Sequence, residues 1–250
     1  MADGARRKGS RPMADGARRK GDRPMADGAR AKIKELIAAR VAKELRDGDV
    51  VNLGIGLPTL VPNFLPAGAK VIFHSENGII GTGPQPRGED AEPMHVVDAG
   101  GSPAAAAPGG CYIDSCLSFA LIRGGHVDCT VLGAFEVDER GGLASWTIPG
   151  QKISGMGGAM DLAVGAKRVI VAMEHTARGR HKILKACRLP LTAQGAADIV
   201  ITEMGVMSVV GSGLVLEEIN PAYTVAQVQA ATEARLAISD GLRYDGYVGL

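Results

Sequence analysis

The sequence predicts an α/β protein built on an open, largely parallel sheet with flanking helices. Short runs of β-branched and aromatic residues, such as 71–73 and 169–173, are typical of buried strands. They alternate with stretches of helical spacing and with glycine-rich loops, which is the order of elements in a parallel α/β sheet. At 250 residues, the chain suits one large domain or two small ones and can bury a substantial core.

The individual elements follow from the spacing of apolar residues and from turn residues. A helix is expected over 31–45, ended by Asp47-Gly48, and a strand over 49–53. Further strands are expected over 94–97, 127–132 with a continuation to 137, 169–173 and 199–202, a hairpin over 206–210 and 214–219, and helices over 113–123, 159–163 and 224–234. Loops are expected over 81–93, 102–110 and 176–180, and the residues after 239 are expected to be loosely attached.

The first residues repeat a unit of 12, in 1–12 and 13–24, and a third copy starts at Met25. The unit has no large apolar residue except Met, so it cannot bury a face. We therefore expect a disordered basic tail over 1–29 and a catalytic domain over 30–250. A basic arm for nucleic acid or membrane is one interpretation of the tail, and a duplicated leader with a start at Met25 is the preferred one.

The charge is spread unevenly along the chain. Residues 1–24 hold eight Lys and Arg and three Asp, which is a net charge of +5. Because the whole chain has a net charge of +1, the remaining residues carry a net charge of −4. The folded part has no basic surplus that would suggest a nucleic-acid partner. Its substrates can still be anionic if single Lys or Arg side chains meet them.

The four cysteines, Cys111, Cys116, Cys129 and Cys187, form no C-x-x-C pair and are too few for a disulfide scaffold. A reducing cytoplasm fits this pattern. The sequence has no apolar run near 18 residues and no hydrophobic leader, so neither a membrane span nor a secretory signal is expected.

The stretch 74–78, His-Ser-Glu-Asn-Gly, follows the predicted strand that begins at Val71. This places Glu76 at the carboxyl end of a strand, where ligands gather in open α/β sheets. Asn77 and Gly78 tolerate the positive φ of a sharp turn. Glu76 is thus a candidate reactive carboxylate on a rigid support; a solvated surface turn is the alternative.

Two glycine-rich stretches are candidate ligand loops. Gly54-Ile55-Gly56 follows the first strand, but a lone G-x-G lacks the third glycine of a dinucleotide site. Residues 154–159 place small residues in succession, which exposes N–H groups to an oxyanion or phosphate. A tight turn and a mobile linker, respectively, are the alternatives.

Seven motifs occur in order along the chain: 52–59 (NLGIGLPT), 75–78 (SENG), 123–128 (RGGHVD), 148–150 (IPG), 155–161 (GMGGAMD), 173–176 (MEHT) and 189–192 (LPLT). Together they resemble the B, or beta, subunit of the class I (3-oxoacid) coenzyme A transferases. They fall in family order, and the resemblance spans roughly residues 33–210.

The resemblance implies the fold of the coenzyme A transferase superfamily and a set of site residues. It gives Glu76 the role of nucleophile, places Asn52 near the reacting carboxylate, and nominates Asn52 and Gly157 as oxyanion donors. The residues assigned to substrate or CoA binding are Gly54, Gly56, Ser75, Asn77, Gly78, Gly155 and Gly158. No metal and no cofactor is expected, because the coenzyme A thioester is itself a substrate.

The implied reaction moves CoA between an acyl-CoA, such as succinyl-CoA or acetyl-CoA, and a carboxylic acid such as a 3-oxoacid, through a glutamyl-CoA thioester on Glu76. The acyl pair stays open. The family's complete enzyme also has an A subunit, so the resemblance implies a partner and an α₂β₂ heterotetramer, and this chain alone is expected to be inactive.

Rival chemistries find less support in the residues. His74-x-Glu76 matches half of a zinc deaminase motif, but the P-C-x-x-C half is missing around Cys111 and Cys116. No G-x-S-x-G elbow of a serine hydrolase occurs, and Gly211-Ser212-Gly213 is interpreted as a turn. His175 and His181 are interpreted as loop or packing residues.

Two further functions remain as alternatives. A non-catalytic ligand-binding sensor on the same superfamily fold would need no nucleophilic Glu76, and such sensors usually carry a helix-turn-helix module, for which there is no room before Ala31. A phosphosugar isomerase would show isomerase activity without acyl transfer.

Overall fold

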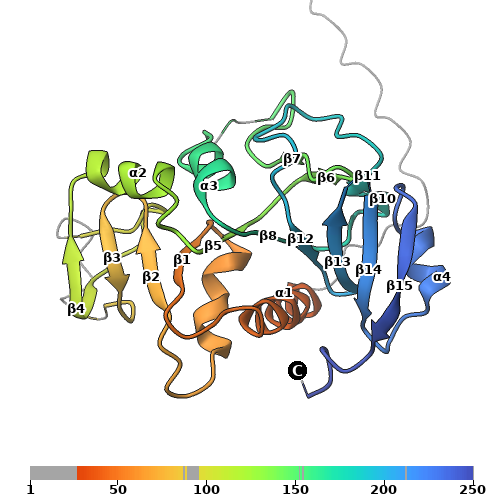
Figure 1. Cartoon of the computed structure of the whole chain (residues 1–250), viewed down its shortest axis with the longest axis horizontal. Helices are drawn as coiled ribbons and strands as arrows, with labels where there is room; N and C mark the ends of the chain where they lie inside the picture. Colours follow the sequence, from red (N-terminus) through yellow and green to blue (C-terminus); the bar gives the residue numbers. More distant parts are fainter. Residues whose placement is uncertain are drawn as a thin grey trace, which may run out of the picture.

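The computed structural model describes residues 27–86, 88, 96–151, 153, 155–211 and 213–249. In this part of the chain, ten strands form one sheet in the order β15-β14-β13-β12-β8-β5-β1-β2-β3-β4 (Figure 1). Their bounds are β1 Val50–Leu53, β2 Ile72–Ser75, β3 Ile79–Thr82, β4 Ala106–Tyr112, β5 Cys129–Leu132, β8 Val169–Ala172, β12 Ile199–Ile201, β13 Gly205–Val210, β14 Gly213–Ile219 and β15 Leu236–Arg243.

The centre of the sheet is parallel and its margins are mixed. Strands β2, β1, β5, β8 and β12 pair in parallel, so their carboxyl ends share one edge. Antiparallel strands extend this centre on both sides, β3 and β4 on one and β13 and β14 on the other, and β15 pairs in parallel with β14. The predicted α/β class and the parallel sheet centre are confirmed.

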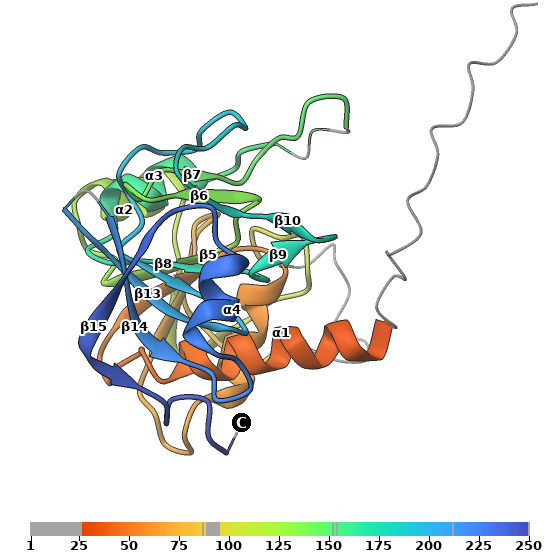
Figure 2. The ribbon, with the colours of Figure 1, turned by 90° about the vertical axis from the view of Figure 1, so that its right-hand side faces the viewer.

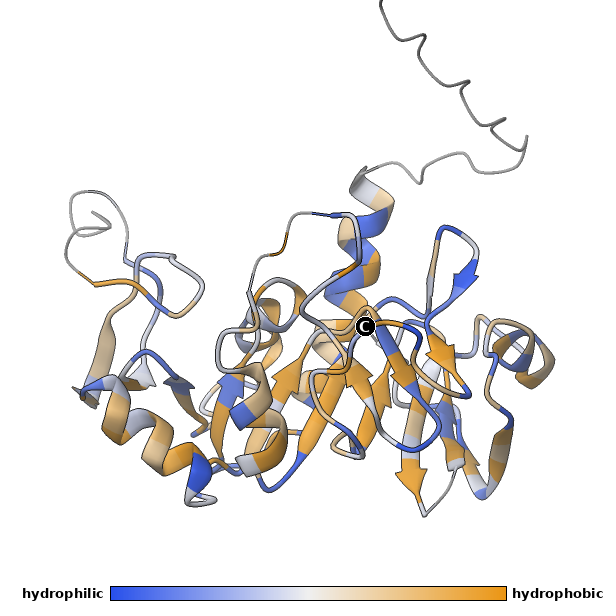
Figure 3. Cartoon of the chain, turned by 90° about the horizontal axis from the view of Figure 1, so that it is seen from above, coloured by the Kyte–Doolittle hydropathy of each residue, from blue (hydrophilic) through white to orange (hydrophobic). Residues whose placement is uncertain are grey.

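Helices cover both faces of the sheet. Helix α1 (Asp27–Ala42) and the 3-10 helix η1 (Leu57–Phe64) lie on one face, and α2 (Ser115–Arg123) and α3 (Ala159–Gly165) lie on the other (Figures 1 and 2). The short helix α4 (Val225–Ala230) lies beside β15, and Thr224 caps it with a capping box. In Figure 3 the central strands are mainly hydrophobic, as expected for strands covered on both faces.

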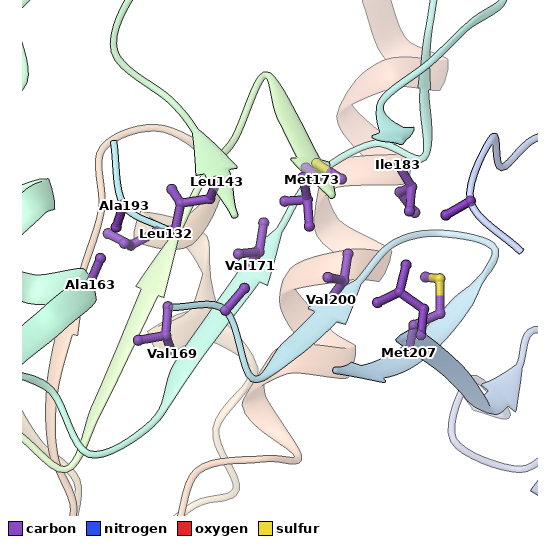
Figure 4. Close-up of a cluster of buried hydrophobic side chains, with 14 of the residues drawn as sticks. Leu132, Leu143, Ala163, Val169, Val171, Met173, Ile183, Ala193, Val200 and Met207 are labelled. Carbon is purple, nitrogen blue, oxygen red and sulfur yellow. The ribbon is translucent and has the colours of Figure 1, made fainter. Parts of the chain in front are cut away.

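Two apolar clusters fill the space between these layers. One lies under α1 and η1 and includes Ile37, Val51 and Val131. The other lies on the α2 and α3 face, where Leu132 and Val200 from two strands meet Leu143 and Ile183 (Figure 4). These last two residues belong to a small second sheet, ordered β11-β6-β7. Its strands are β6 Glu136–Asp138, β7 Leu143–Ala144 and β11 Ile183–Leu184.

The structure differs from the sequence-based prediction at one margin of the sheet. Residues 79–82 form β3 and residues 106–112 form β4, where loops were expected over 81–93 and 102–110. Strand β4 is rich in Ala, Gly and Pro, which are poor strand formers. An edge strand tolerates Pro108 because its outer side has no strand to pair with. Of the strand expected over 94–97, residues 94 and 95 lie outside the described residues, and Val97 forms an isolated bridge with Pro103.

Several helix and strand boundaries also differ from those expected from the sequence. The expected continuation of 127–132 to 137 is instead β6, which leaves the main sheet for the small one. The loop expected over 176–180 contains a two-stranded hairpin, β9 (Thr176–Ala177) with β10 (Arg180–His181). The helix expected over 224–234 ends at Ala230.

The C-terminal segment is attached firmly, in contrast to the expectation for residues after 239. Strand β15 continues to Arg243. Tyr247 is buried, and its hydroxyl donates a hydrogen bond to the Thr202 carbonyl oxygen. The prediction failed because this attachment depends on single distant contacts and not on a local pattern.

At the N-terminus, helix α1 begins at Asp27, so residues 27–29 lie in the helix and not in the expected tail. The repeats of 1–24 lie outside the described residues, as do Ser154 and Ser212 of the two predicted glycine-rich turns. The disordered tail therefore stays a prediction.

Candidate active site

A cleft of about 1410 Å³ opens at the carboxyl edge of the parallel strands. Its walls include the last residue of four of these strands and the residues that follow it: 53–57 at β1, 75–76 at β2, 132–135 at β5 and 172–174 at β8. Residues 155–159, from the second glycine-rich stretch, complete the wall near β2. This is the position in which open α/β sheets bind ligands.

Glu76 lies at the end of β2, half-buried, and lines the cleft. The chain turns sharply after it, because the Gly78 N–H donates to the Ser75 carbonyl oxygen at 2.9 Å and β3 returns antiparallel to β2. Gly78 has a φ of +126°, and a Cβ added there would overlap the Ile113 carbonyl oxygen. Glycine is therefore required at this turn, which holds Glu76 at a defined place on the rim.

Asn52 is the direct partner of Glu76. It is fully buried in β1, in register with His74 of β2. Its side-chain Nδ2 donates to Glu76 Oε2 at 3.0 Å. The expected proximity of Asn52 to the carboxylate is found. The Asn52 amide N–H points to this carboxylate, and Asn52 is absent from the residues that line the cleft.

The second glycine-rich loop lies directly against Glu76. A Cβ added to Gly158 would stand 2.9 Å from Glu76 Cγ, so glycine permits this close approach. Gly155 and Gly157 line the cleft with φ values of +94° and +54°. Among the described residues, the Gly157 N–H has no hydrogen-bond acceptor. Such a loop can offer N–H groups to an oxyanion.

The first glycine-rich stretch also lines the cleft. Gly54 N–H donates to the Val131 carbonyl oxygen at 2.8 Å, and an added Cβ would stand 3.1 Å from that oxygen, so Gly54 fixes the join between β1 and β5. Gly56 has a φ of +90° and open space where a Cβ would stand. Both residues therefore shape the wall, and Gly56 leaves room beside the backbone.

Ser75 and Asn77 form a small network that holds the turn. Ser75 Oγ donates to Asn77 Oδ1 at 2.8 Å and accepts from the Ala99 N–H at 2.9 Å. Asn77 Nδ2 donates to the Val97 carbonyl oxygen at 2.7 Å. Ser75 lines the cleft, whereas Asn77 and Gly78 are not among its lining residues. The structure thus supports a positioning role for Asn77 and Gly78 more directly than contact with a ligand.

His74 and Ser118 belong to the site, and sequence reasoning did not identify them as such. His74 is buried, with Nε2 2.9 Å from Ser118 Oγ and Nδ1 3.4 Å from Asn52 Nδ2. Burial lowers the pKa of His74, and the Glu76 carboxylate opposes this effect. Side chains alternate between the two faces of a strand, so residues 74 and 76 are expected on the same face. This spacing is the one sequence signal that could have linked His74 to Glu76.

Three cations line the cleft and were also missed. Arg30 and Lys34 lie one helical turn apart on α1, and Lys182 precedes β11. Arg30 Nε pairs with Glu174 Oε1 at 2.8 Å. Burial lowers the pKa of Lys182 to about 8, with Glu174 and Glu203 acting in the opposite direction. Lys34 and Lys182 have no ion-pair partner among the described residues, so they can meet an anionic ligand.

His175 follows the end of β8 and is completely buried. Its Nδ1 lies 2.9 Å from Thr202 Oγ1 and its Nε2 lies 2.8 Å from Thr232 Oγ1. Burial lowers the pKa of His175 to about 4. His175 does not line the cleft, in line with the interpretation as a packing residue, whereas His181 is exposed in β10.

Among the described residues, no group of three or more His, Cys, Asp or Glu side chains is arranged to hold a metal ion. All four cysteines are free thiols. None of the described helices has the length and hydropathy needed to span a membrane.

Comparison with known proteins places this geometry in a family. Residues 34–231 match the family described as Coenzyme A transferase. The chain is 50% identical over 210 residues to the beta subunit of the acetate CoA-transferase of Escherichia coli, covering 84% of this chain and 95% of that protein. It is 44% identical over 210 residues to the B subunit of the probable succinyl-CoA:3-ketoacid coenzyme A transferase of Bacillus subtilis, covering 84% and 97% respectively.

Solved structures share the fold. The acyl-CoA transferase YdiF of Escherichia coli superposes with a TM-score of 0.69 at 22% identity over 92% of this chain, which spans only 45% of that longer chain. Glutaconate coenzyme A-transferase from Acidaminococcus fermentans superposes with a TM-score of 0.62 at 18% identity, over 85% of this chain and 88% of that one. The chain belongs to the coenzyme A transferase family, as a relative of its B, or beta, subunits.

Proposed function

We propose that this chain is the catalytic B subunit of a transferase that moves CoA from an acyl-CoA to a carboxylic acid, with Glu76 as the covalent nucleophile. One observation carries the proposal. The Glu76 carboxylate lines the cleft, accepts a hydrogen bond from Asn52 Nδ2 at 3.0 Å, and lies against the loop that contains Gly158. Carboxylates are established nucleophiles in covalent catalysis, and donated hydrogen bonds favour their ionised form.

The first half of the reaction loads CoA onto the enzyme. A Glu76 carboxylate oxygen attacks the thioester carbonyl carbon, the C–S bond breaks, and CoA leaves as a thiolate from an acyl-glutamyl anhydride. The thiolate then attacks the Glu76 carbonyl carbon of the anhydride and the first acid leaves as its carboxylate. Glu76 now carries CoA as a thioester.

The second half repeats these steps with a new acid. Its carboxylate attacks the Glu76 thioester carbonyl carbon and expels the CoA thiolate, which gives a second anhydride. The thiolate then attacks the acyl carbon of the new acid, and Glu76 leaves as a free carboxylate. Electrons and atoms balance without a redox partner or a cofactor, since the thioester supplies the activation.

The glycine loops assist the addition steps in this proposal. Each attack builds negative charge on a carbonyl oxygen, and the Gly157 N–H, which has no acceptor among the described residues, is the nominee to stabilise it. The loss of one such donor typically costs about 10²–10³ in rate. Asn52 is retained as a nominee for the Glu76 carbonyl oxygen, because its N–H already points at that carboxyl group.

The cations of the cleft support anionic substrates. Acyl acids and CoA both carry negative charge, and Lys34 and Lys182 line the cleft without an ion pair to a described side chain. The relatives named above are acetate and succinyl-CoA:3-ketoacid enzymes. We propose a short-chain acid or 3-oxoacid as acceptor and acetyl-CoA or succinyl-CoA as donor.

We further propose that the chain works with an A subunit, as an α₂β₂ heterotetramer in the cytoplasm. The relatives are themselves named as beta or B subunits, which supports the partner, and closed symmetry is the usual form of such assemblies. The four free thiols support a reducing compartment. Active transfer by this chain alone, as a monodisperse preparation, would contradict the partner proposal.

The test is the transfer rate of Glu76 variants, which are co-expressed with the A subunit, then assayed with succinyl-CoA or acetyl-CoA and a panel of acids. Glu76→Gln keeps the size of the side chain but removes the nucleophile, so transfer is expected to vanish. Glu76→Asp is expected to lose about 10²-fold, because it retracts the carboxylate by about 1 Å.

Glu174→Gln is the matched control, since Glu174 is a second carboxylate in the same cleft. It is expected to retain transfer with an altered KM through the loss of its Arg30 pair. Near-normal transfer by Glu76→Gln would overturn the proposal. Ligand binding without any transfer in the assembled complex would favour a sensor, and isomerisation of a phosphosugar without transfer would favour an isomerase.

A further inference from the structure

A row of buried polar side chains crosses the centre of the sheet beside the cleft. Thr130 of β5, Asn52 of β1 and His74 of β2 are in register on three neighbouring parallel strands. Their exposed fractions are 0%, 0% and 5%. Strands covered on both faces are normally apolar, and buried polar groups are costly unless they are hydrogen-bonded. This row therefore requires a physical explanation.

Two of these polar groups, His74 and Asn52, form with Ser118 one chain of contacts that ends at Glu76. Ser118 Oγ, fully buried in α2, lies 2.9 Å from His74 Nε2. His74 Nδ1 lies 3.4 Å from Asn52 Nδ2. Asn52 Nδ2 lies 3.0 Å from Glu76 Oε2 and 3.2 Å from the His74 carbonyl oxygen. A helix on the covered face is thus linked to the carboxylate on the rim.

The direction of each contact follows from donor chemistry. The Asn52 amide carries two N–H groups and has three acceptors in reach: one N–H is donated to Glu76 Oε2, and the other faces both the His74 carbonyl oxygen and Nδ1. This arrangement favours a His74 Nδ1 that carries no proton. The His74 proton then sits on Nε2 and is donated to Ser118 Oγ. Asn52 Oδ1 and Thr130 Oγ1 have no partner among the described residues. Among the described residues, the Asn52 amide is therefore held only by the contacts of its two N–H groups with His74 and Glu76.

We propose that His74, held by Ser118, is a positioning residue that keeps the Asn52 N–H aimed at Glu76 only while the imidazole is neutral. The inference rests on the proposed function, because it assigns a means of orientation to the same nucleophile. A proton on Nδ1 would place two donors against each other. The repulsion would displace the Asn52 amide and weaken the contact of its N–H with Glu76 Oε2.

The surroundings of His74 favour the neutral form. The facing groups are Asn52 from β1 and Ser118 from α2, which are uncharged, and Ile80 from β3 is its strand neighbour. Glu76 is the one titratable group among the described residues that acts on it. Burial outweighs this carboxylate and lowers the pKa of His74 below 6.5. The contact is therefore formed at neutral pH and lost on acidification.

The test uses the co-expressed complex and measures kcat and KM across pH. Ser118→Ala removes the acceptor of the His74 proton and is expected to lower kcat about tenfold with KM unchanged, because small errors in the placement of reacting groups are costly. Ser115→Ala, at an exposed position of the same helix, is the matched control and should behave as wild type.

The pH profile separates positioning from a merely structural role. His74→Gln keeps an acceptor for Asn52 and a donor for Ser118, but it does not titrate. The acid limb of kcat that belongs to His74 should disappear in this variant and persist in His126→Gln, an exposed histidine. An unchanged acid limb in His74→Gln, or wild-type kcat in Ser118→Ala, would overturn the inference.

Two measurements keep the outcome decisive if His74→Gln fails to assemble. The ¹⁵N shifts of His74 in the wild-type complex should show a proton on Nε2 and none on Nδ1 at neutral pH; an Nδ1–H tautomer would refute the inference. The residue that carries the covalent CoA adduct, which is the intermediate of the proposed function, tests that proposed function itself. An adduct away from Glu76 defeats the proposed function, whereas an adduct on Glu76 with an unchanged pH profile defeats only the role of His74.

Discussion

His74 and His175 are both buried at the carboxyl ends of sheet strands, and burial lowers the pKa of each. They differ in what their ring nitrogens meet. His175 lies between two threonine hydroxyls, at 2.9 and 2.8 Å, and does not line the cleft that contains Glu76. His74 meets Ser118 on one side and, on the other, an amide that continues to Glu76. The two histidines are similarly buried, so the difference lies in their partners. These partners predict that His175 contributes to stability and that His74 contributes to activity.

The largest stability effect is expected from His175. His175→Ala removes two buried hydrogen bonds and leaves a cavity, which should lower the free energy of unfolding by about 3 kcal/mol. The kcat of the molecules that remain folded should not change. Thermal or urea unfolding of the complex with parallel kinetics checks this, and a large kcat loss at full stability would break the comparison.

The pH dependence of stability should also belong to His175. Its folded pKa of about 4 lies below the unfolded value of 6.5, so the unfolded chain binds the proton more tightly. The stability from neutral His175 is complete above pH 6.5 and is lost as the pH falls toward 4, by up to about 3 kcal/mol.

The control for this pH effect is His175→Gln, measured by unfolding at several pH values. The difference between wild type and this variant isolates His175 from Glu203, whose pKa burial raises. A difference that stays constant between pH 6.5 and 4 would contradict the assignment.

A smaller effect is expected from the cleft cations. Lys182→Gln should raise KM for the anionic substrate about tenfold with little change in kcat, since about 1.4 kcal/mol of binding is lost with a charge-assisted contact. In the wild type, KM should rise above pH 8 as Lys182 loses its proton. The neighbouring exposed Lys185→Gln is the control; equal KM values in both variants would remove Lys182 from the site.

The smallest effect is expected from the N-terminal repeats. A chain that starts at Met25 keeps every described residue of both histidine networks and should retain its melting temperature and kcat. The repeat unit lacks large apolar residues with which to dock on the body. A clear drop in either quantity after this deletion would show that the repeats contribute to the folded enzyme.

The parts of the fold that depend on local patterns could be predicted from the sequence. The apolar runs of β1, β5 and β8 and the turn at Gly78 indicated their structure directly. Strand β4 could not be predicted, because its Ala, Gly and Pro residues are poor strand formers and its pairing with β3 decides its conformation.

The site divides in the same way. Glu76 and Asn52 came from motifs and strand ends, and the structure brings them within 3.0 Å. Ser118 and Lys182 could not be found in this manner, since each reaches the site from an element distant in sequence. Only the crossing of α2 over β2 makes Ser118 a partner of His74. Tertiary contacts of this kind leave no periodic signal.

The most direct test of the account is the location of the covalent intermediate. The complex is incubated with acyl-CoA without an acceptor acid, digested and examined by mass spectrometry. The peptide containing residues 74–78 should carry CoA on Glu76, hydroxylamine should remove it, and Glu76→Gln should not form it. CoA attached to another residue, or no attachment in an actively transferring complex, would contradict the central claim that Glu76 is the nucleophile.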